Sequence, residues 1–259
     1  MTDYSTLVQV EDTATPLARF VFHFLGGANQ DPVGLEGLTC LMNRLMIRGT
    51  QQHTRAEYED LVEQLGVDLI PTCGASSLSI GGSLHRRHAA SWFHLIQRAF
   101  TQPRFDVDEI ERSKRELLAE FDMLFDEDAS LGRYFLKQAL FQGTPYGRSI
   151  LGTPESLARI TREDLLAHRN QTYTRSNLLV SCAGDVSHAP VQAYLSELID
   201  ALPIGVPVQR RKLELGPCST RVVIVDKPDR AQCQVFSGQL VPGAGQATML
   251  PYQFGALVL

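Results

Sequence analysis

The chain has 259 residues, of which 44% are hydrophobic and 20% are charged, and its formal net charge is −5. This composition is typical of a soluble globular protein with a sizeable core, and it argues against a disordered chain. Because binding to nucleic acid depends on a basic surface, the acidic balance also argues against nucleic acid as a partner.

The sequence carries no strong targeting signal. No apolar run reaches the roughly 18 residues that a membrane-spanning helix needs, so no membrane span is predicted. The N-terminus has neither the basic start nor the apolar core of a secretory signal. The five cysteines form no close pair in the sequence, which favours reduced thiols and a cytoplasmic location over a disulfide framework.

The chain begins with strand patterns and continues into helices. Alternation and a high content of β-branched or aromatic residues predict strands over 5–10 and 17–25. Apolar residues then recur at helical spacing, which predicts a helix over 35–48. Thr54 and Glu57 have the spacing of a capping box, so a second helix is expected to begin there.

A hairpin and a run of helices follow. Alternation predicts two hairpin strands over 67–73 and 76–84. Amphipathic patterns predict helices over 86–101, 106–125 and 129–141.

The next part of the chain returns to a strand. A loop with a short helix is expected over 143–161, and Thr161 has the position of a cap for the helix after it. A strand over 177–184 and a helix over 187–201 complete the pattern. Hairpins followed by runs of helices indicate an α+β fold, a sheet with helices packed on one side, and argue against a doubly wound parallel sheet.

The remaining sequence predicts a second domain. We expect an α+β domain over 1–203, a proline-containing linker over 204–218, and the truncated beginning of a second homologous α+β domain over 219–259. Two strands of that second domain are expected over 220–228 and 232–241. The chain ends on the apolar run GALVL, which we interpret as the sign of a piece of a longer protein.

Several stretches in a fixed order carry a family resemblance. They include GGANQDPVGLEGLTCLMNRLMIRGT, ERSKRELLAEFDMLFDED and PYGRSILGTPESLARITREDLLAHRNQTYTRSNLLVSCAGDV. With these stretches the chain resembles the pitrilysin/insulinase family of inverted-motif zinc peptidases and its non-catalytic relatives. Those relatives include mitochondrial processing peptidase subunits, respiratory-complex core proteins and bacterial two-subunit peptidases. The resemblance covers essentially all of the chain and implies a peptidase-type α+β domain.

The family motif falls on unusual residues here. In the family a helix carries His-x-x-Glu-His shortly before a Gly-Thr pair, the histidines hold zinc, and the glutamate activates the zinc-bound water. Counted back from the Gly-Thr pair of this chain, the first histidine position falls on Cys40, the base position on Asn43 and the second histidine position on Arg44. The distal glutamate ligand of the family corresponds to Glu120.

The chemistry of these residues indicates a degenerate active site without catalytic residues. A thiolate such as Cys40 can bind zinc, but we favour the interpretation that it is a small buried side chain on an apolar helix. Asn43 cannot act as a general base, and Arg44 has no lone pair and would repel a metal ion. We therefore expect no metal in this chain, with zinc only in a catalytic partner. We expect Arg44 to pair with Glu120, the alternative being that both side chains point to solvent.

Two further features of the sequence concern this site. Glu116 shares a helix face with Glu120, but this spacing is also typical of solvated glutamates. The resemblance implies that the strand containing Ser79, Ile80, Gly81 and Gly82 is an edge strand that captures extended peptides, and paired glycines often mark a close backbone approach.

Three functions follow from the resemblance. The chain could be the non-catalytic partner of a zinc-bearing catalytic subunit, with which it would enclose peptide substrates. It could instead be a structural scaffold, like the respiratory-complex core proteins. It could also be an active hydrolase with a rearranged site that uses Cys40, Glu120 and a histidine brought in by folding.

Overall fold

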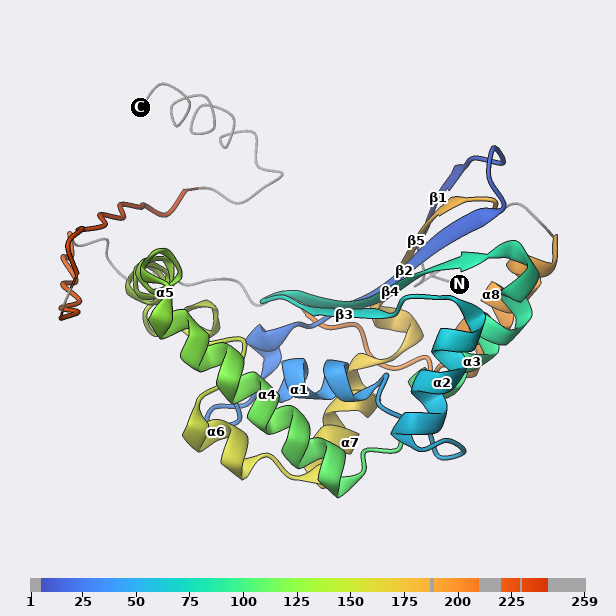
Figure 1. Cartoon of the computed structure of the whole chain (residues 1–259), viewed down its shortest axis with the longest axis horizontal. Coiled ribbons are helices and arrows are strands. Elements are labelled where there is room, and N and C mark those ends of the chain that lie inside the picture. Colours follow the sequence, from blue (N-terminus) through green and yellow to red (C-terminus); the bar gives the residue numbers. More distant parts are fainter. Residues whose placement is uncertain (1–5, 187–188, 210–219, 229, 242–259) are drawn as a thin grey trace. The chain divides into compact units, whose positions relative to one another are not determined.

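The computed structural model of the chain describes residues 6–186, 189–209, 220–228 and 230–241 (Figure 1). The chain divides into two compact units, which are described separately. The first consists of residues 1–122 and 148–212, and the second consists of residues 123–147 and 213–259.

The first unit is built on one mixed sheet of five strands in the order β1-β5-β2-β4-β3. Strand β1 pairs in parallel with β5, and the other neighbours are antiparallel. The strand bounds are β1 Thr6–Glu11, β2 Leu17–Leu25, β3 Ile70–Cys73, β4 Ser77–His85 and β5 Leu178–Gly184. Strand β3 lies at the edge of the sheet, and this position matters for the candidate site.

Eight α-helices are assigned in the described residues. Figure 1 shows α1, α3 and α8 on one side of the sheet. The bounds are α1 Leu38–Leu45, α2 Arg55–Leu65, α3 Ala89–Thr101, α4 Val107–Asp126, α5 Asp128–Leu140, α6 Pro154–Arg159, α7 Arg162–Thr172 and α8 Ala189–Ala201. The predicted α+β fold, with helices packed on one side of a sheet, is confirmed.

The core forms because alternate residues of β2 point toward the helices. Ala18, Phe20, Phe22 and Phe24 are buried, whereas the residues between them are exposed or half-buried. Their rings meet the aromatic face of α3; for example, the centroids of Phe22 and Phe100 lie 5.4 Å apart in an edge-on contact. Burying each such side chain contributes roughly 1.5–3 kcal/mol, so this interface holds the helices on the sheet.

Helix α1 is shorter than the predicted helix over 35–48. Gly37 precedes it with a φ of +93°, in the left-handed region that favours glycine, so the helix cannot extend toward Leu35. The carboxylate of Asp31 accepts hydrogen bonds from the backbone N–H groups of Gly37 (2.9 Å) and Thr39 (3.0 Å). These bonds satisfy donors at the start of α1, and they fix where its side chains lie.

The hairpin and the C-terminal segments also differ from the prediction. Strand β3 begins at Ile70 rather than at residue 67. The strands expected over 220–228 and 232–241 are wrong for the described residues, since neither 220–228 nor 230–241 contains a strand. A strand requires a hydrogen-bonded neighbour, and these segments form no ladder with any strand of the described chain.

The described part of the second unit is held around the start of α5. The Lys227 ammonium lies 2.7 Å from the Asp128 carboxylate, and it also donates to the main-chain carbonyls of Phe125 and Asp126. The Arg230 guanidinium approaches the same carboxylate at 3.6 Å. A cation is favoured at the carbonyl end of α4, and the Asp128 carboxylate in the first turn of α5 pairs with both side chains.

A membrane-spanning helix must be both long and apolar. Among the described residues, no helix combines the length and the apolar character that crossing a bilayer would require.

Candidate functional site

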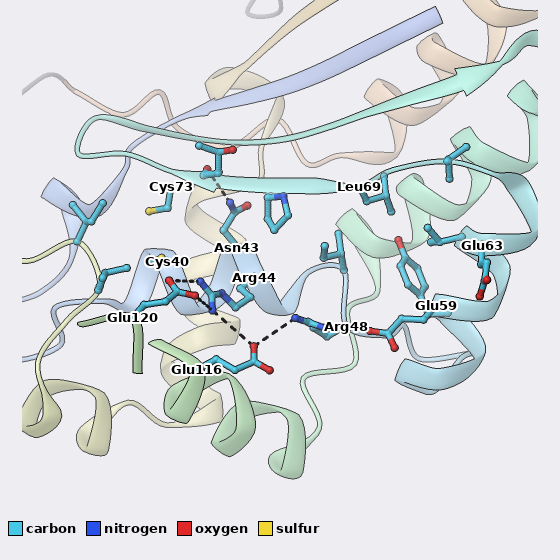
Figure 2. Close-up of a pocket in the computed structure, with 18 residues that line it drawn as sticks. Cys40, Asn43, Arg44, Arg48, Glu59, Glu63, Leu69, Cys73, Glu116 and Glu120 are labelled. Atoms are coloured by element: carbon cyan, nitrogen blue, oxygen red, sulfur yellow. Dashed lines mark hydrogen bonds and ion pairs between the residues drawn. The ribbon is translucent and has the colours of Figure 1, made fainter. Parts of the chain in front are cut away.

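The residues singled out by the motif line one open cleft of about 960 Å³ in the first unit (Figure 2). Helix α1 contributes Cys40, Asn43 and Arg44, and α4 contributes Glu116 and Glu120. Helix α2, strand β3 and the loop at 150–151 complete the wall. The structure therefore brings together all four positions of the degenerate motif.

Arg44 and Glu120 form an ion pair with two short contacts. The two terminal nitrogens of the guanidinium lie 2.9 Å from the two carboxylate oxygens of Glu120. This fork-to-fork geometry is the strong form of the interaction. Burial works against the charge of Arg44, but the hydrogen bond and charge of Glu120 outweigh it and raise the pKa of Arg44. The expected pairing of these two residues is present in the structure.

The pair is one part of a line of alternating charges, which we call the outer ladder: Arg44, Arg48, Glu59, Glu116 and Glu120. A carboxylate oxygen of Glu116 lies 3.8 Å from Arg44 and 3.5 Å from Arg48, and Arg48 reaches Glu59 at 3.1 Å. The Arg44 side chain is 19% exposed and that of Glu120 is 45% exposed. Each cation of the ladder therefore already has carboxylate partners, while solvent still reaches the group.

Asn43 is buried, and both ends of its amide make hydrogen bonds. Its amide nitrogen donates to the carbonyl oxygens of Thr72 (2.9 Å) and Ser79 (3.2 Å), and its oxygen accepts from the Tyr173 hydroxyl at 2.6 Å. Three separate parts of the first unit are thereby tied to α1. The residue at the base position of the motif thus cross-links the fold, and its amide is not basic enough to take a proton near neutral pH.

A second buried group lies near the start of α1. The Thr39 hydroxyl is 2.5 Å from the Asp31 carboxylate and 2.7 Å from Nε2 of His168. Burial raises the pKa of Asp31 to about 6, although hydrogen bonds from Thr39 and Gly37 oppose the shift. Burial also lowers the pKa of His168 to about 4. At neutral pH Thr39 therefore donates to a carboxylate and accepts from a neutral imidazole.

We call the buried set the inner cluster: Asp31, Thr39, Asn43, His168 and Tyr173. All of its members are at most 7% exposed. The cluster holds the register of α1, whereas the outer ladder lines the cleft.

The sheet order corrects one prediction about peptide binding. Ser79, Ile80, Gly81 and Gly82 belong to β4, which lies between β2 and β3 and is not an edge strand. Residues 79–81 pair with β2 on one side and with β3 on the other, so their backbone groups are not open to an added strand. The prediction failed because strand order depends on long-range pairing, which local alternation does not reveal.

The donor set of the cleft does not fit zinc. Zinc prefers thiolate, imidazole and carboxylate ligands, but the cleft offers a guanidinium and an amide at two of the motif positions. None of the described lining residues is a histidine. In the described part of the chain, no three His, Cys, Asp or Glu side chains come together in a way that could hold a metal ion.

Some residues of the site were missed by sequence reasoning. Tyr173 and Cys73 reach the α1 motif from distant parts of the chain, and no local pattern signals them. Arg48 and Glu116 carried a weak signal, because each lies four residues from a motif position on the same helical stretch or helix. Such spacing is common on solvated helices. Only the structure, in which α1 and α4 line the same cleft, shows that these residues belong to the site.

Two family descriptions match this sequence. Residues 7–154 match the insulinase family, peptidase family M16. Residues 159–259 match the description of the peptidase M16 inactive domain. The first match alone covers more than half of the chain.

Individual relatives are distant in sequence. The Non-peptidase homolog YmxG of Helicobacter pylori is 22% identical over 225 residues, which make up 87% of this chain and 52% of that protein. A probable mitochondrial-processing peptidase subunit beta of Arabidopsis thaliana is 22% identical over 192 residues, which make up 74% of this chain and 34% of that protein. The chain thus spans about half, or less, of the length of these relatives.

Solved structures share the fold. The crystal structure of a peptidase M16 inactive domain from Pseudomonas fluorescens matches with a TM-score of 0.76 and 21% identity, over 82% of this chain and 52% of that chain. A protease from Helicobacter pylori matches with a TM-score of 0.69 and 14% identity, over 83% of this chain and 51% of that chain. Together with the family match, this likeness places the chain by sequence and by fold: it belongs to the insulinase family, peptidase family M16.

Proposed function

We propose that this chain is a non-catalytic member of its family that pairs with a separate zinc-bearing chain to enclose and hold peptide substrates. The observation that carries the proposal is the Arg44–Glu120 ion pair at two positions where the resemblance places zinc ligands. A guanidinium has no lone pair and keeps its positive charge, so it excludes a metal and engages the remaining carboxylate. The chemistry of proteolysis would then reside in the partner.

The base position supports the same conclusion independently. An amide has no useful proton affinity near neutral pH, so it cannot activate water as a glutamate does. Asn43 is also held by Thr72, Ser79 and Tyr173. Swinging it toward a substrate would leave the buried Tyr173 hydroxyl without this partner, at a cost of about 1–3 kcal/mol.

The names of two relatives support a subunit role. The Helicobacter pylori relative is named a non-peptidase homolog, and the Arabidopsis thaliana relative is named a subunit of a processing peptidase. Because this chain spans only part of their length, its activity, substrate and partner are proposals. We further propose a cytoplasmic location, zinc only in the catalytic partner, and a second homologous domain that begins after a linker over 204–218.

The free edge of β3 is the place we propose for an extended peptide. Asn43 Nδ2 reaches the carbonyl oxygens of both Thr72 and Ser79, which pair across β3 and β4. One nitrogen can reach both oxygens only if they face each other between the strands. By the alternation of an antiparallel ladder, the backbone groups of Pro71 and Cys73 then face the free edge beside the cleft.

This edge is incomplete as a peptide-binding strand. Pro71 has no backbone N–H, so the edge offers a carbonyl oxygen but no donor at that residue. An added strand would lose one hydrogen bond there. We therefore expect weak, transient capture of peptides by this chain, which suits a partner that holds a substrate for another subunit.

The decisive experiment measures zinc and peptidase activity. The purified chain is analysed alone and after co-expression with a chain from the same organism that carries an intact His-x-x-Glu-His motif. We expect stoichiometric zinc and peptide cleavage only in the co-purified pair. Replacing the motif glutamate of that second chain with glutamine should abolish cleavage without separating the pair.

Two results would contradict the proposal. Stoichiometric zinc in the isolated chain, with cleavage that a chelator removes, would indicate an active enzyme with a rearranged site. Failure of the two chains to associate would remove the subunit role and leave the scaffold role as the better reading of the fold.

A further inference from the structure

A pair of thiols lies in the cleft and has no part in the proposed function. Cys40 on α1 and Cys73 on β3 are separated by 32 residues in the sequence, yet both line the same cleft. The two thiols influence each other: Cys73 lowers the pKa of Cys40, and Cys40 raises the pKa of Cys73. Figure 2 shows both side chains at one end of the cleft, away from Glu59 and Glu63 at the other end.

The neighbouring contacts hold these two residues in register. Asn43 lies one helical turn after Cys40 and donates to the carbonyl of Thr72, the residue next to Cys73. This buried bond ties α1 to β3 beside the thiol pair. The two cysteines therefore lie on elements that are joined to each other beside them.

We propose that Cys40 and Cys73 form an oxidisable dithiol site, which a hydroperoxide converts into a disulfide between α1 and β3. The site would take small hydroperoxides that enter through the cleft. The inference does not depend on the proposed subunit role, because it concerns only the thiols of this chain.

The surroundings give the two thiols different roles. The hydrogen bond from Cys73 lowers the pKa of Cys40; burial opposes this shift, the charge of Arg44 assists it, and the charges of Glu120 and Asp31 oppose it. The bond to Cys40, together with burial, raises the pKa of Cys73. Cys40 is thus the nucleophile, and Cys73 keeps its proton until it is needed.

The reaction balances in two steps. The Cys40 thiolate attacks the near oxygen of hydrogen peroxide, the O–O bond breaks, and one proton is taken up, giving a Cys40 sulfenic acid and water. The sulfur of Cys73 then attacks the sulfenic sulfur and the S–O bond breaks. The proton of Cys73 leaves with the hydroxide as a second water. Two thiols lose two electrons in total, and one peroxide is reduced to two waters.

Oxidation would change the cleft directly. A covalent link between Cys40 and Cys73 would fasten the edge strand to α1 next to Pro71 and Thr72. It would also remove the only thiols among the described residues that line the cleft.

The test uses the full chain in reduced form, treated with one equivalent of hydrogen peroxide and then alkylated. Trypsin places Cys40 in the peptide 20–44 and Cys73 in the peptide 56–86, each with a single cysteine. We expect a linked pair of these two peptides, lacking two hydrogens and separated by dithiothreitol. Cys182, buried in the sheet, and Cys233, exposed, serve as internal controls.

Two variants of Cys73 separate its roles. Cys73→Ser keeps a hydrogen-bond donor but cannot form the link, so Cys40 should still react quickly and accumulate a sulfenic acid that dimedone traps. Cys73→Ala removes the donor, so alkylation of Cys40 at pH 7 should slow severalfold. Peroxide treatment that leaves peptides 20–44 and 56–86 unlinked overturns the proposal. So does a Cys40 that is alkylated no faster than Cys182.

Discussion

The inner cluster and the outer ladder meet on the same short helix, α1, but they are built by opposite rules. The inner cluster consists of buried polar groups, in which each side chain has specific hydrogen-bond partners. The outer ladder consists of full charges that remain partly in solvent, with Glu120 45% exposed. Buried hydrogen bonds are costly to break, whereas exposed ion pairs contribute little.

This difference separates two of the motif positions. Asn43, at the base position, belongs to the inner cluster and supports the fold. Arg44, at the second ligand position, belongs to the outer ladder and sets the charge of the cleft. Replacing the motif therefore affects stability through one residue and electrostatics through the other.

The largest effect is expected for Asn43→Ala. The change removes three hydrogen bonds and leaves the Tyr173 hydroxyl buried without a partner. We expect a loss of about 3 kcal/mol in the free energy of unfolding, measured by chemical denaturation. The control Gln64→Ala, an exposed residue of α2, should change stability by no more than about 0.5 kcal/mol. If the two variants change the free energy of unfolding equally, the buried hydrogen bonds of Asn43 do not stabilise the fold as the inner cluster requires.

The next prediction concerns the pH dependence of the inner cluster. Asp31 has a pKa of about 6 when folded and 3.8 as its ordinary value, so between these values the folded state binds more protons and stability falls as pH rises. His168 has a pKa of about 4 when folded and 6.5 as its ordinary value, so the unfolded state binds more protons and stability rises with pH. The two contributions oppose each other between about pH 4 and pH 6.

Single substitutions should separate these opposed contributions. Asp31→Asn removes the contribution to stability that falls as pH rises. The stability of this variant, relative to that of the unmodified chain, should therefore increase from pH 4 to pH 6. His168→Gln removes the contribution to stability that rises with pH. The stability of this variant, relative to that of the unmodified chain, should therefore decrease over the same interval. The measurement is a series of denaturation curves across this range. If the stability of both variants and of the unmodified chain depends on pH in the same way, neither group titrates as its burial implies.

A smaller effect is expected in the outer ladder. A double-mutant cycle with Arg44→Ala and Glu120→Ala should give a coupling of about 0.5–1 kcal/mol, because solvent screens the pair. Removing Arg44 alone should destabilise the fold more than removing both residues, since it leaves Glu116 and Glu120 facing each other without their shared cation. No measurable coupling would mean that the pair has no energetic role.

An effect of similar size concerns the edge strand beside the cleft. Pro71→Val restores a backbone donor at the free edge of β3 and should tighten binding of an extended peptide by about 0.5–1.5 kcal/mol. The matched control is Thr72→Val, whose backbone groups face β4, and it should leave peptide affinity unchanged. Affinity is measured by fluorescence anisotropy of a labelled peptide. If both variants bind equally well, the peptide does not add to this edge.

Much of this arrangement could be predicted from local patterns. Periodicity and capping signals indicated the helices and strands of the first unit, because side-chain spacing and cap chemistry act over a few residues. The pairing of Arg44 with Glu120 followed from the register of the motif. The prediction of two strands near the C-terminus was wrong for the described residues, because β-branched content alone does not supply a pairing neighbour.

The amino-acid sequence was enough to identify the α+β fold. It was also enough to show that Arg44 cannot act as a metal ligand, since a guanidinium lacks a lone pair wherever it lies. Only the folded chain decided that β3, not β4, forms the sheet edge, and that Tyr173 and Cys73 meet α1. These features arise from contacts between segments far apart in sequence. Such contacts depend on strand pairing and packing across the whole unit, which no local pattern encodes.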